Sequence, residues 1–328
     1  NQGSLIVTRD VSVLGNLTNR STGTLRVLGG GAGGQSPANL TFADGSLLNN
    51  SGTIELTDNG LNSLGTTTIT VTNGLLLNGP QGTIDILAGA RSTERTIAGN
   101  LNNQGTLRLV DRGFTFRDGL ANSGTIEATG GNLIITNNTA QLDNSGSLTA
   151  TNGNQFQVLA NAQLAGSLAN GDQVNIDNAT ITDGFNNQGL VIATRNVSVE
   201  GNLTNQSSGT LRVLGGGSGG QSPANLTFAD GSLLDNSGTI ELTDNGLNSL
   251  GTTTITVTNG LLLNGPQGTI DILTGDRTTA RTIEGDVDNQ GTLTFQHSAS
   301  VNGDVVNTGT INGQGGTLNI TGGLTSSG

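Results

Sequence analysis

The sequence contains no Cys, Met, Trp, Tyr or Lys, and it has one His among its 328 residues. Without Cys, a disulfide framework and a thiolate zinc site are both excluded. Without Trp and Tyr, the chain cannot build the aromatic platform on which sugars or nucleobases stack. A single His argues against a histidine-based catalytic centre.

Charge is scarce and mostly negative. Charged residues make up 11% of the chain, the net charge is −12 at pH 7, and the pI is about 4.2. This balance argues against binding to a phosphate backbone. The hydrophobic fraction of 32% is below the roughly 45–50% of an average domain, yet the low charge is not the composition of a disordered chain. No apolar run reaches the roughly 18 residues of a transmembrane helix, and no signal peptide is visible.

Gly and Asn are abundant instead, with 54 Gly and about 40 Asn, and long stretches of sequence recur. The segment 15–19 reappears as 201–205, and 35–42 reappears as 221–228, so that both matches lie at one and the same offset. We therefore divide the chain into a first long repeat, 1–186, and a second, incomplete copy, 187–328, which continues directly from the first.

A shorter motif, Asn-x-Gly-Thr/Ser-Leu/Ile, recurs inside the long repeat, with looser variants at Gly23, Gly82 and Gly166. Its glycines follow one another at similar intervals, the shortest from Gly105 to Gly124 and the longest from Gly52 to Gly82. The clear instances are Asn50 with Gly52, Asn103 with Gly105, Asn122 with Gly124, Asn144 with Gly146, Asn236 with Gly238, Asn289 with Gly291, and Asn307 with Gly309.

Each motif leads into a stretch in which apolar and polar residues alternate. Ile54 and Leu56, for example, alternate with Glu55 and Thr57, which is the pattern of a strand with one buried face. The Asn-x-Gly that precedes each strand predicts a turn, because Gly adopts positive φ freely and Asn tolerates the left-handed region. No stretch shows the spacing of an amphipathic helix.

One strand-and-turn motif per coil predicts an all-β chain, a parallel β-solenoid of about 15 coils of 19–30 residues. The rule for parallel crossovers predicts a right-handed coil. Stacked coils share one narrow aliphatic core, and Asn side chains of successive coils are expected to pair amide to amide. The longer intervals hold excursions, at the glycine-rich segment 29–37 and at 61–65. Antiparallel sandwiches, the alternative, would need hairpins that the single motif per coil does not supply.

No catalytic, cofactor-binding or metal-binding residue is predicted. Asp85 and Asp271 alternate with apolar neighbours and are expected to face outward into solvent, and His297 is expected to do the same. No Gly-Lys-Ser/Thr follows the glycine-rich segments, so a phosphate-binding loop is excluded. Four further acidic residues next to Gly or Asn are expected to be turn residues: Asp44, Asp58, Asp230 and Asp244.

The tandem Asn-x-Gly-Thr-Leu/Ile coils, poor in Cys, Lys and aromatic residues, resemble the β-helical shafts of secreted bacterial adhesins. The similar groups are filamentous-haemagglutinin-type exoproteins, autotransporter passengers and giant repeat-rich surface proteins. The resemblance implies a non-catalytic, extracellular or cell-surface stalk or fibre segment of a larger protein. Its implied partners are neighbouring solenoid segments, or copies of itself end to end, and host or matrix glycans, with no nucleic acid and no membrane insertion. Neither end shows an atypical capping coil, so we expect the array to continue or to meet another molecule.

Two other functions stay open. A polysaccharide-active β-helix enzyme would need a cluster of carboxylates and Arg, for which Arg26 with Glu55 and Arg212 with Glu241 are the nearest candidates. A glycan-binding or ice-binding surface would need a flat Thr array on many coils. The Thr-rich segment 66–72 recurs only at 252–258.

Overall fold

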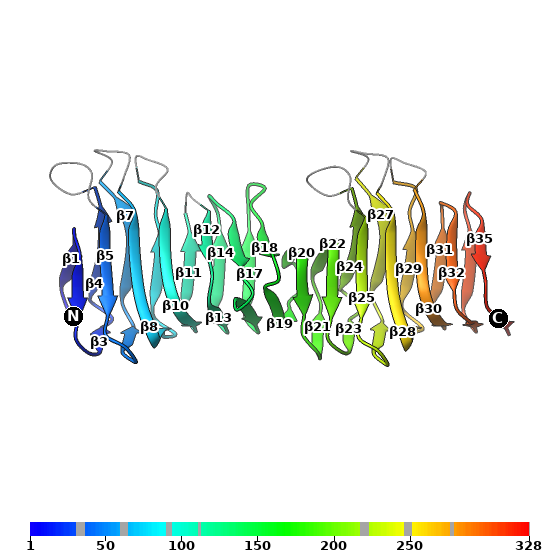
Figure 1. Cartoon of the computed structure of the whole chain (residues 1–328), viewed down its shortest axis with the longest axis horizontal. Coiled ribbons are helices and arrows are strands. Elements are labelled where there is room, and N and C mark those ends of the chain that lie inside the picture. The colour runs from blue at the N-terminus through cyan, green and yellow to red at the C-terminus, as the bar shows by residue number, and fades with distance from the viewer. Residues whose placement is uncertain are drawn as a thin grey trace. The chain divides into compact units, whose positions relative to one another are not determined.

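The computed structural model describes residues 1–30, 37–59, 65–89, 94–110, 113–216, 223–245, 251–275 and 279–327, which form strands β1 to β36 and no helix. The chain divides into two compact units, Asn1–Val158 and Leu159–Gly328. Each unit is a stack of parallel strands (Figure 1). No helix among the described residues is long and apolar enough to cross a membrane.

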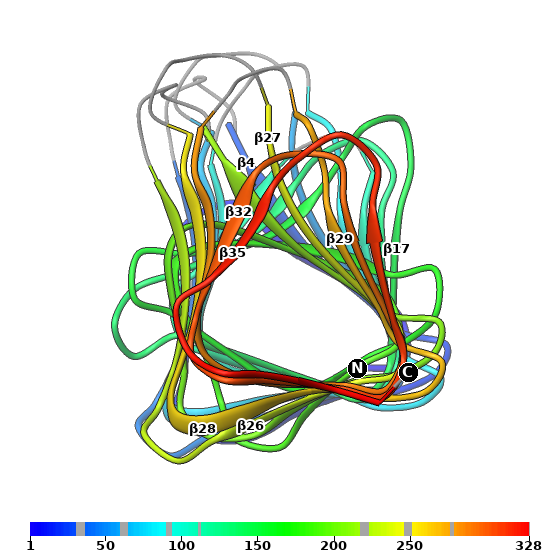
Figure 2. The same ribbon diagram turned by 90° about the vertical axis from the view of Figure 1, so that its right-hand side faces the viewer.

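In the first unit the chain runs round three sides of a coil and then repeats the circuit (Figure 2). The long strands β8 (Thr67–Asn78) and β10 (Arg95–Asn103) bend from the second side onto the third. The other strands of the first side are β1 (Ser4–Val7), β4 (Thr24–Gly29), β7 (Thr53–Asp58), β9 (Thr83–Ile86), β11 (Thr106–Leu109), β14 (Thr125–Ala128) and β17 (Ser147–Ala150). Those of the second side are β2 (Val11–Val13), β5 (Ala38–Phe42), β12 (Phe114–Phe116) and β15 (Leu133–Thr136), and those of the third are β3 (Leu17–Asn19), β6 (Leu47–Asn50), β13 (Gly119–Asn122) and β16 (Gln141–Asn144). The last strand that begins in this unit is β18 (Phe156–Leu159).

The second unit has the same three sides. Its long strands that span two sides are β19 (Gln163–Leu168), β20 (Gln173–Ile181), β22 (Leu190–Val199), β28 (Thr253–Asn264) and β30 (Arg281–Asn289). Its first side also holds β24 (Thr210–Gly215), β27 (Thr239–Asp244), β29 (Thr269–Ile272), β31 (Thr292–Phe295) and β34 (Thr310–Gly313). Its second side holds β25 (Ala224–Phe228), β32 (Ala299–Asn302) and β35 (Leu318–Ile320), and its third β21 (Phe185–Asn187), β23 (Leu203–Asn205), β26 (Leu233–Asn236), β33 (Val305–Asn307) and β36 (Leu324–Ser326).

The pairing register confirms the predicted parallel solenoid. Ser4 lies opposite Thr24, and Thr53 lies opposite Thr83, so that the length of each coil equals the spacing of the motif glycines that precede its strands. In the second unit Gln173 lies opposite Leu190, and this coil is shorter than the predicted range.

The core consists of the inward-facing residues of all three sides. Leu25 and Val27 of β4, and Ile54 and Leu56 of β7, are completely buried, and burying such a side chain stabilises the fold by roughly 1.5–3 kcal/mol. The sequence predicts a purely aliphatic core, and this prediction is wrong. Six of the seven Phe side chains are buried among the described residues, at Phe42, Phe114, Phe116, Phe156, Phe185 and Phe228.

The long sequence repeat is also a repeat of strands. The bounds of β4 and β24, and those of β8 and β28, are separated by the same offset as the two copies of the sequence. The division at residue 186 remains a description of the sequence, since the first compact unit ends at Val158 and the second begins at Leu159. Most of the predicted excursions, within 29–37 and 61–65, lies outside the described residues.

Candidate functional site

A buried asparagine ends most strands of the third side. These asparagines stack coil upon coil, and each except the last of its stack donates a hydrogen bond from Nδ2 to Oδ1 of the next over 2.6–2.8 Å. We call the two stacks the asparagine ladders. The first consists of Asn19, Asn50, Asn78, Asn103, Asn122 and Asn144, and the second of Asn187, Asn205, Asn236, Asn264, Asn289 and Asn307.

Most rungs are also bonded to the backbone. The Nδ2 of Asn78 donates to the carbonyl oxygens of Gly82 at 3.2 Å and Thr106 at 3.1 Å, as well as to Asn103 at 2.7 Å. Because carbonyl oxygens can only accept, these contacts fix which end of the amide faces them. Every rung therefore points the same way along its unit.

The Asn-x-Gly spacing finds only part of the ladders. Asn19, Asn78, Asn205 and Asn264 lie four residues before their glycine instead of two, and Asn187 opens the second copy with Gly189 two residues on. The turn between Asn and Gly is two residues longer here, but the Asn side chain still lies in the ladder. An Asn two or four residues before each glycine is the signal that would have found these members.

The glycines of the motif serve a different purpose from the one predicted. None of the seven has a left-handed φ, and neither has any of their asparagines. A Cβ on Gly105 would instead lie 2.2 Å from the carbonyl oxygen of Gly82 and 2.4 Å from that of Gly79. The glycine is needed because the turns of successive coils approach too closely for a side chain.

The variant motif at Gly166 is misplaced in the sequence interpretation. Ser167 and Leu168 pair with Asn186 and Asn187, on the third side, and do not begin a first-side strand. Leu168 is completely buried and occupies the position of a ladder asparagine. The ladder of the second unit therefore starts after this residue.

Charged side chains form a row on the outside of the first side. In the first unit Arg26, Glu55, Asp85 and Arg108 follow one another in register. Arg26 pairs with Glu55, and Arg108 donates to both oxygens of Asp85 at 2.7 and 2.8 Å. These hydrogen bonds raise the pKa of both guanidinium groups above their ordinary value. Asp85 is only 6% exposed, so the prediction that it is solvated is wrong, because Arg108 covers it.

The matching row of the second unit lacks one cation. Arg212 pairs with Glu241, but Thr294 occupies the place of Arg108 next to Asp271. Burial, and then the negative charge of Glu241, raise the pKa of Asp271, and a hydrogen bond with Thr294 partly opposes them. Asp271 is half-buried, so it faces outward as predicted but is not fully solvated.

Two acidic residues predicted as turn residues are buried instead. Asp58 ends β7 and accepts a hydrogen bond from Arg95 at 2.6 Å, with both side chains almost completely buried. Asp244 and Arg281 form the same pair in the second unit, where Thr279 also donates to Asp244. Each carboxylate is the last residue of an alternating strand, and its Arg lies 37 residues later in the sequence, so no local pattern shows the pairing.

Two of the residues predicted to lie in turns do so, and the predicted solvent-facing His is partly exposed. Asp44 and Asp230 lie in turns and accept hydrogen bonds from Asn73 and Asn259 at 2.8 Å. His297 is half-buried and not freely exposed, since its Nε2 lies 3.0 Å from the carbonyl oxygen of Thr279.

The threonine-rich strand has polar neighbours that the sequence did not predict. In the second unit Thr256 lies in register between Thr227 and Glu284, and Thr227 follows Ser198. Thr180 precedes Ser198 in the same register, so the outward column of hydroxyl groups covers four coils and ends at a carboxylate.

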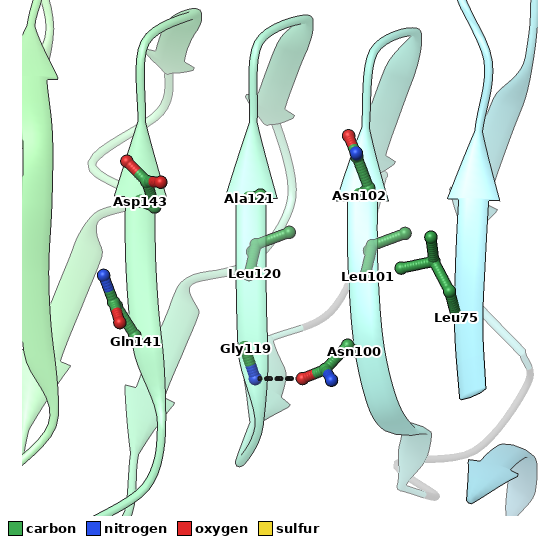
Figure 3. A pocket seen from close by; sticks show the side chains of 9 residues that line it. All are labelled: Leu75, Asn100, Leu101, Asn102, Gly119, Leu120, Ala121, Gln141 and Asp143. Atoms are coloured by element: carbon green, nitrogen blue, oxygen red, sulfur yellow. Dashed lines mark hydrogen bonds between the residues drawn. The ribbon is translucent and has the colours of Figure 1, made fainter. Parts of the chain in front are cut away.

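An open groove lies on the outside of the third side of the first unit, with a volume of about 290 Å³ (Figure 3). Strand β13 contributes only Gly119 and Ala121 to its outer surface, between longer side chains of β10 and β16. The residues that line it are Leu75, Asn100, Leu101, Asn102, Gly119, Leu120, Ala121, Gln141 and Asp143.

Among the described residues, no group of three or more His, Cys, Asp or Glu side chains is arranged to hold a metal ion.

No protein-family model and no curated protein matches this sequence. Among solved structures, the chain is similar to a hyper-glycosylated TibA55-350 fragment whose glycosylation TibC catalyses. The two share 12% sequence identity over 95% of this chain and 98% of that chain, with a TM-score of 0.26. A TM-score this low supports no inference about the fold or function of this chain.

Proposed function

We propose that this chain is a non-catalytic, structural β-solenoid segment of an extracellular or cell-surface bacterial shaft, with an adhesive role. Its partners in this proposal are neighbouring solenoid segments or further copies, and host or matrix glycans. The proposal draws on the resemblance of the repeated coils to adhesin shafts and on the construction of the coil stacks.

The asparagine ladders are the observation that carries the structural part. Each rung adds side-chain hydrogen bonds between coils that the backbone already joins. A buried amide that loses its partners costs about 1–3 kcal/mol, so a coil cannot slip along its neighbour without breaking a rung. Such a stack keeps its register under load, which is what a stalk requires.

The test compares two adjacent asparagines of β6. Asn50 is a buried rung bonded to Asn19 and Asn78, whereas Asn49 faces outward and is half-buried. Single-molecule force measurement on the full chain should show that Asn50→Ala lowers the unfolding force. Equilibrium denaturation should show a loss of roughly 2–4 kcal/mol, because two neighbouring amides lose a partner.

The Asn49→Ala variant should behave like the unaltered chain in both measurements. Equal losses for the two variants, or unfolding of the unaltered chain at negligible force, would count against the structural proposal. Release of reducing sugar from acidic or neutral polysaccharides by the purified chain would favour the enzyme alternative instead.

A further inference from the structure

The groove on the third side of the first unit owes its depth to two small residues. In Figure 3, Ala121 lies between Asn102 of β10 and Asp143 of β16, its partners in the strand register. Gly119 lies in the same way between Asn100 and Gln141. Longer side chains therefore stand on both sides of a low floor.

The polar groups at the groove are open to a ligand. The side chains of Asn102, Gln141 and Asp143 have no hydrogen-bond partner among the described residues, whereas the side chain of Asn100 accepts a bond from the backbone amide of Gly119 at 3.2 Å. Two amides and one carboxylate offer both donors and acceptors within one short stretch of surface. A ligand with neighbouring hydroxyl groups matches that mixture, because each hydroxyl can both donate and accept a hydrogen bond.

The negative charge of the groove lining and the apolar side chain of Leu75 limit the class of ligand that could bind. The lining contains no Arg or His, it includes Asp143, and the chain carries a net charge of −12. A phosphate or an acidic sugar would be repelled. Leu75, at the far side of β10, adds an apolar surface suited to the C–H face of a sugar ring. A volume of about 290 Å³ is at the lower end of ligand-binding pockets, roughly 300 Å³.

The second copy of the repeat keeps the strands but not the small residues of the floor. In its third side Val306 stands beside Asp288, as Ala121 stands beside Asn102 in the first. Asp304 donates its amide to Asp286, as Gly119 does to Asn100. Val306, which is 45% exposed, and Asp304 thus replace the two small floor residues, and Asp288 and Asp286 replace the neighbouring Asn102 and Asn100. The coil does not need the groove in order to fold.

We infer that this groove is a binding site for a neutral glycan, held by Asn102, Gln141 and Asp143 over the floor made by Gly119 and Ala121. The inference rests on the adhesive part of the proposed function and gives it a location and a ligand class. Failure of the glycan site would leave the structural proposal standing, because the ladder variants are judged by unfolding and not by binding.

The experiment uses the full chain and a panel of neutral oligomers of glucose, galactose, mannose and N-acetylglucosamine, with sialylated and sulfated members as charged controls. Neutral members should bind and charged ones should not. Ala121→Val places the second copy's residue on the floor, and it should weaken binding of the best oligomer at least tenfold. Asp143→Ala, which removes a hydrogen-bonding group, should also weaken it.

Val306→Ala, the reverse change in the other copy, is the matched control and should leave binding unchanged. Circular dichroism should show that Ala121→Val folds normally, since Val favours strands. The inference is overturned if no neutral oligomer binds at millimolar concentration, or if Ala121→Val binds as the unaltered chain does. It is also overturned if Ala121→Val changes self-association instead, as sedimentation would show, because the groove would then contact another copy.

Discussion

At the scale of single residues, position within the coil decides what each polar side chain does. Asn49 and Asn50 are neighbours in β6, yet one faces outward and the other is a buried rung. The same holds for acidic residues. Asp44 lies in a turn, whereas Asp58 is buried against Arg95. Residue type is the same within such pairs, so the role of each side chain depends on the face of the strand on which it lies and on its contacts with other coils.

The outward row of charges predicts a pH-dependent stability. The raised folded-state pKa of Asp271 means that its protonated form stabilises the fold below the ordinary pKa of 3.8, and this contribution is lost as pH rises through the folded-state value. At pH 7 the ionised Asp271 therefore destabilises the second unit. Thr294→Arg, which supplies the cation that Arg108 gives Asp85, should raise the free energy of unfolding by about 0.2–1 kcal/mol at pH 7.

Urea denaturation at pH 7 and at pH 3 measures this effect. The gain should disappear at pH 3, where Asp271 is protonated. Arg108→Thr, which converts the first row into the second, should lower stability at pH 7. An equal gain from Thr294→Arg at both pH values would show that the new Arg acts through packing and not through the charge of Asp271.

At the scale of elements, the strand and the turn are both built for stacking. The alternation of apolar residues correctly predicts the strands, because an inward residue of one coil meets the inward residue of the next. The turns lie at the motif glycines as predicted, but the reason for the glycine is different. These glycines permit close approach between coils, and the residues with left-handed φ lie at other corners, as Asn73 and Asn259 do.

This reason for the glycine predicts a large effect of one methyl group. Gly105→Ala should destabilise the chain by about 1–3 kcal/mol, since the new Cβ would meet two rigid carbonyl oxygens. Gly15→Ala is the matched control, because its Cβ would meet nothing within 4 Å and its φ is not left-handed. Thermal denaturation of the two variants makes the comparison. A similar melting temperature for both would mean that the coils can separate to admit the methyl group.

At the scale of the whole molecule, composition sets the behaviour in solution. The net charge is −12 at pH 7 and approaches zero near pH 4.2. Self-repulsion keeps copies apart at neutral pH and is lost near the pI. Light scattering should therefore show dispersed chains at pH 7 and association as the pH is lowered to about 4.2. Unchanged scattering over that range would mean that charge is not what keeps the copies apart.

Much of this architecture could be predicted from the sequence, because a solenoid repeats the same local pattern in every coil. Period-two alternation and the recurring glycine are enough to predict parallel coils. The coil boundary near Gly166 could not be placed, because Leu168 replaces the asparagine that marks the third side. The pair of Asp58 and Arg95 joins residues outside the motif on coils of unequal length, and the sequence pattern does not determine that contact. The motif glycines do give the register around Ala121, but the alternation of apolar and polar residues does not show that a groove forms there.

The one-way bonding of the ladders gives each coil stack an electrical direction. Side-chain amides that all donate toward the higher-numbered coil align their dipoles, and aligned bonds in a dry interior polarise one another. Removing one rung leaves two unlike defects, a donor without its acceptor on one side and an acceptor without its donor on the other. A coil inserted between two rungs continues the bonding only if it supplies an amide oriented like theirs, whereas an apolar residue at that position, such as Leu168, interrupts the ladder.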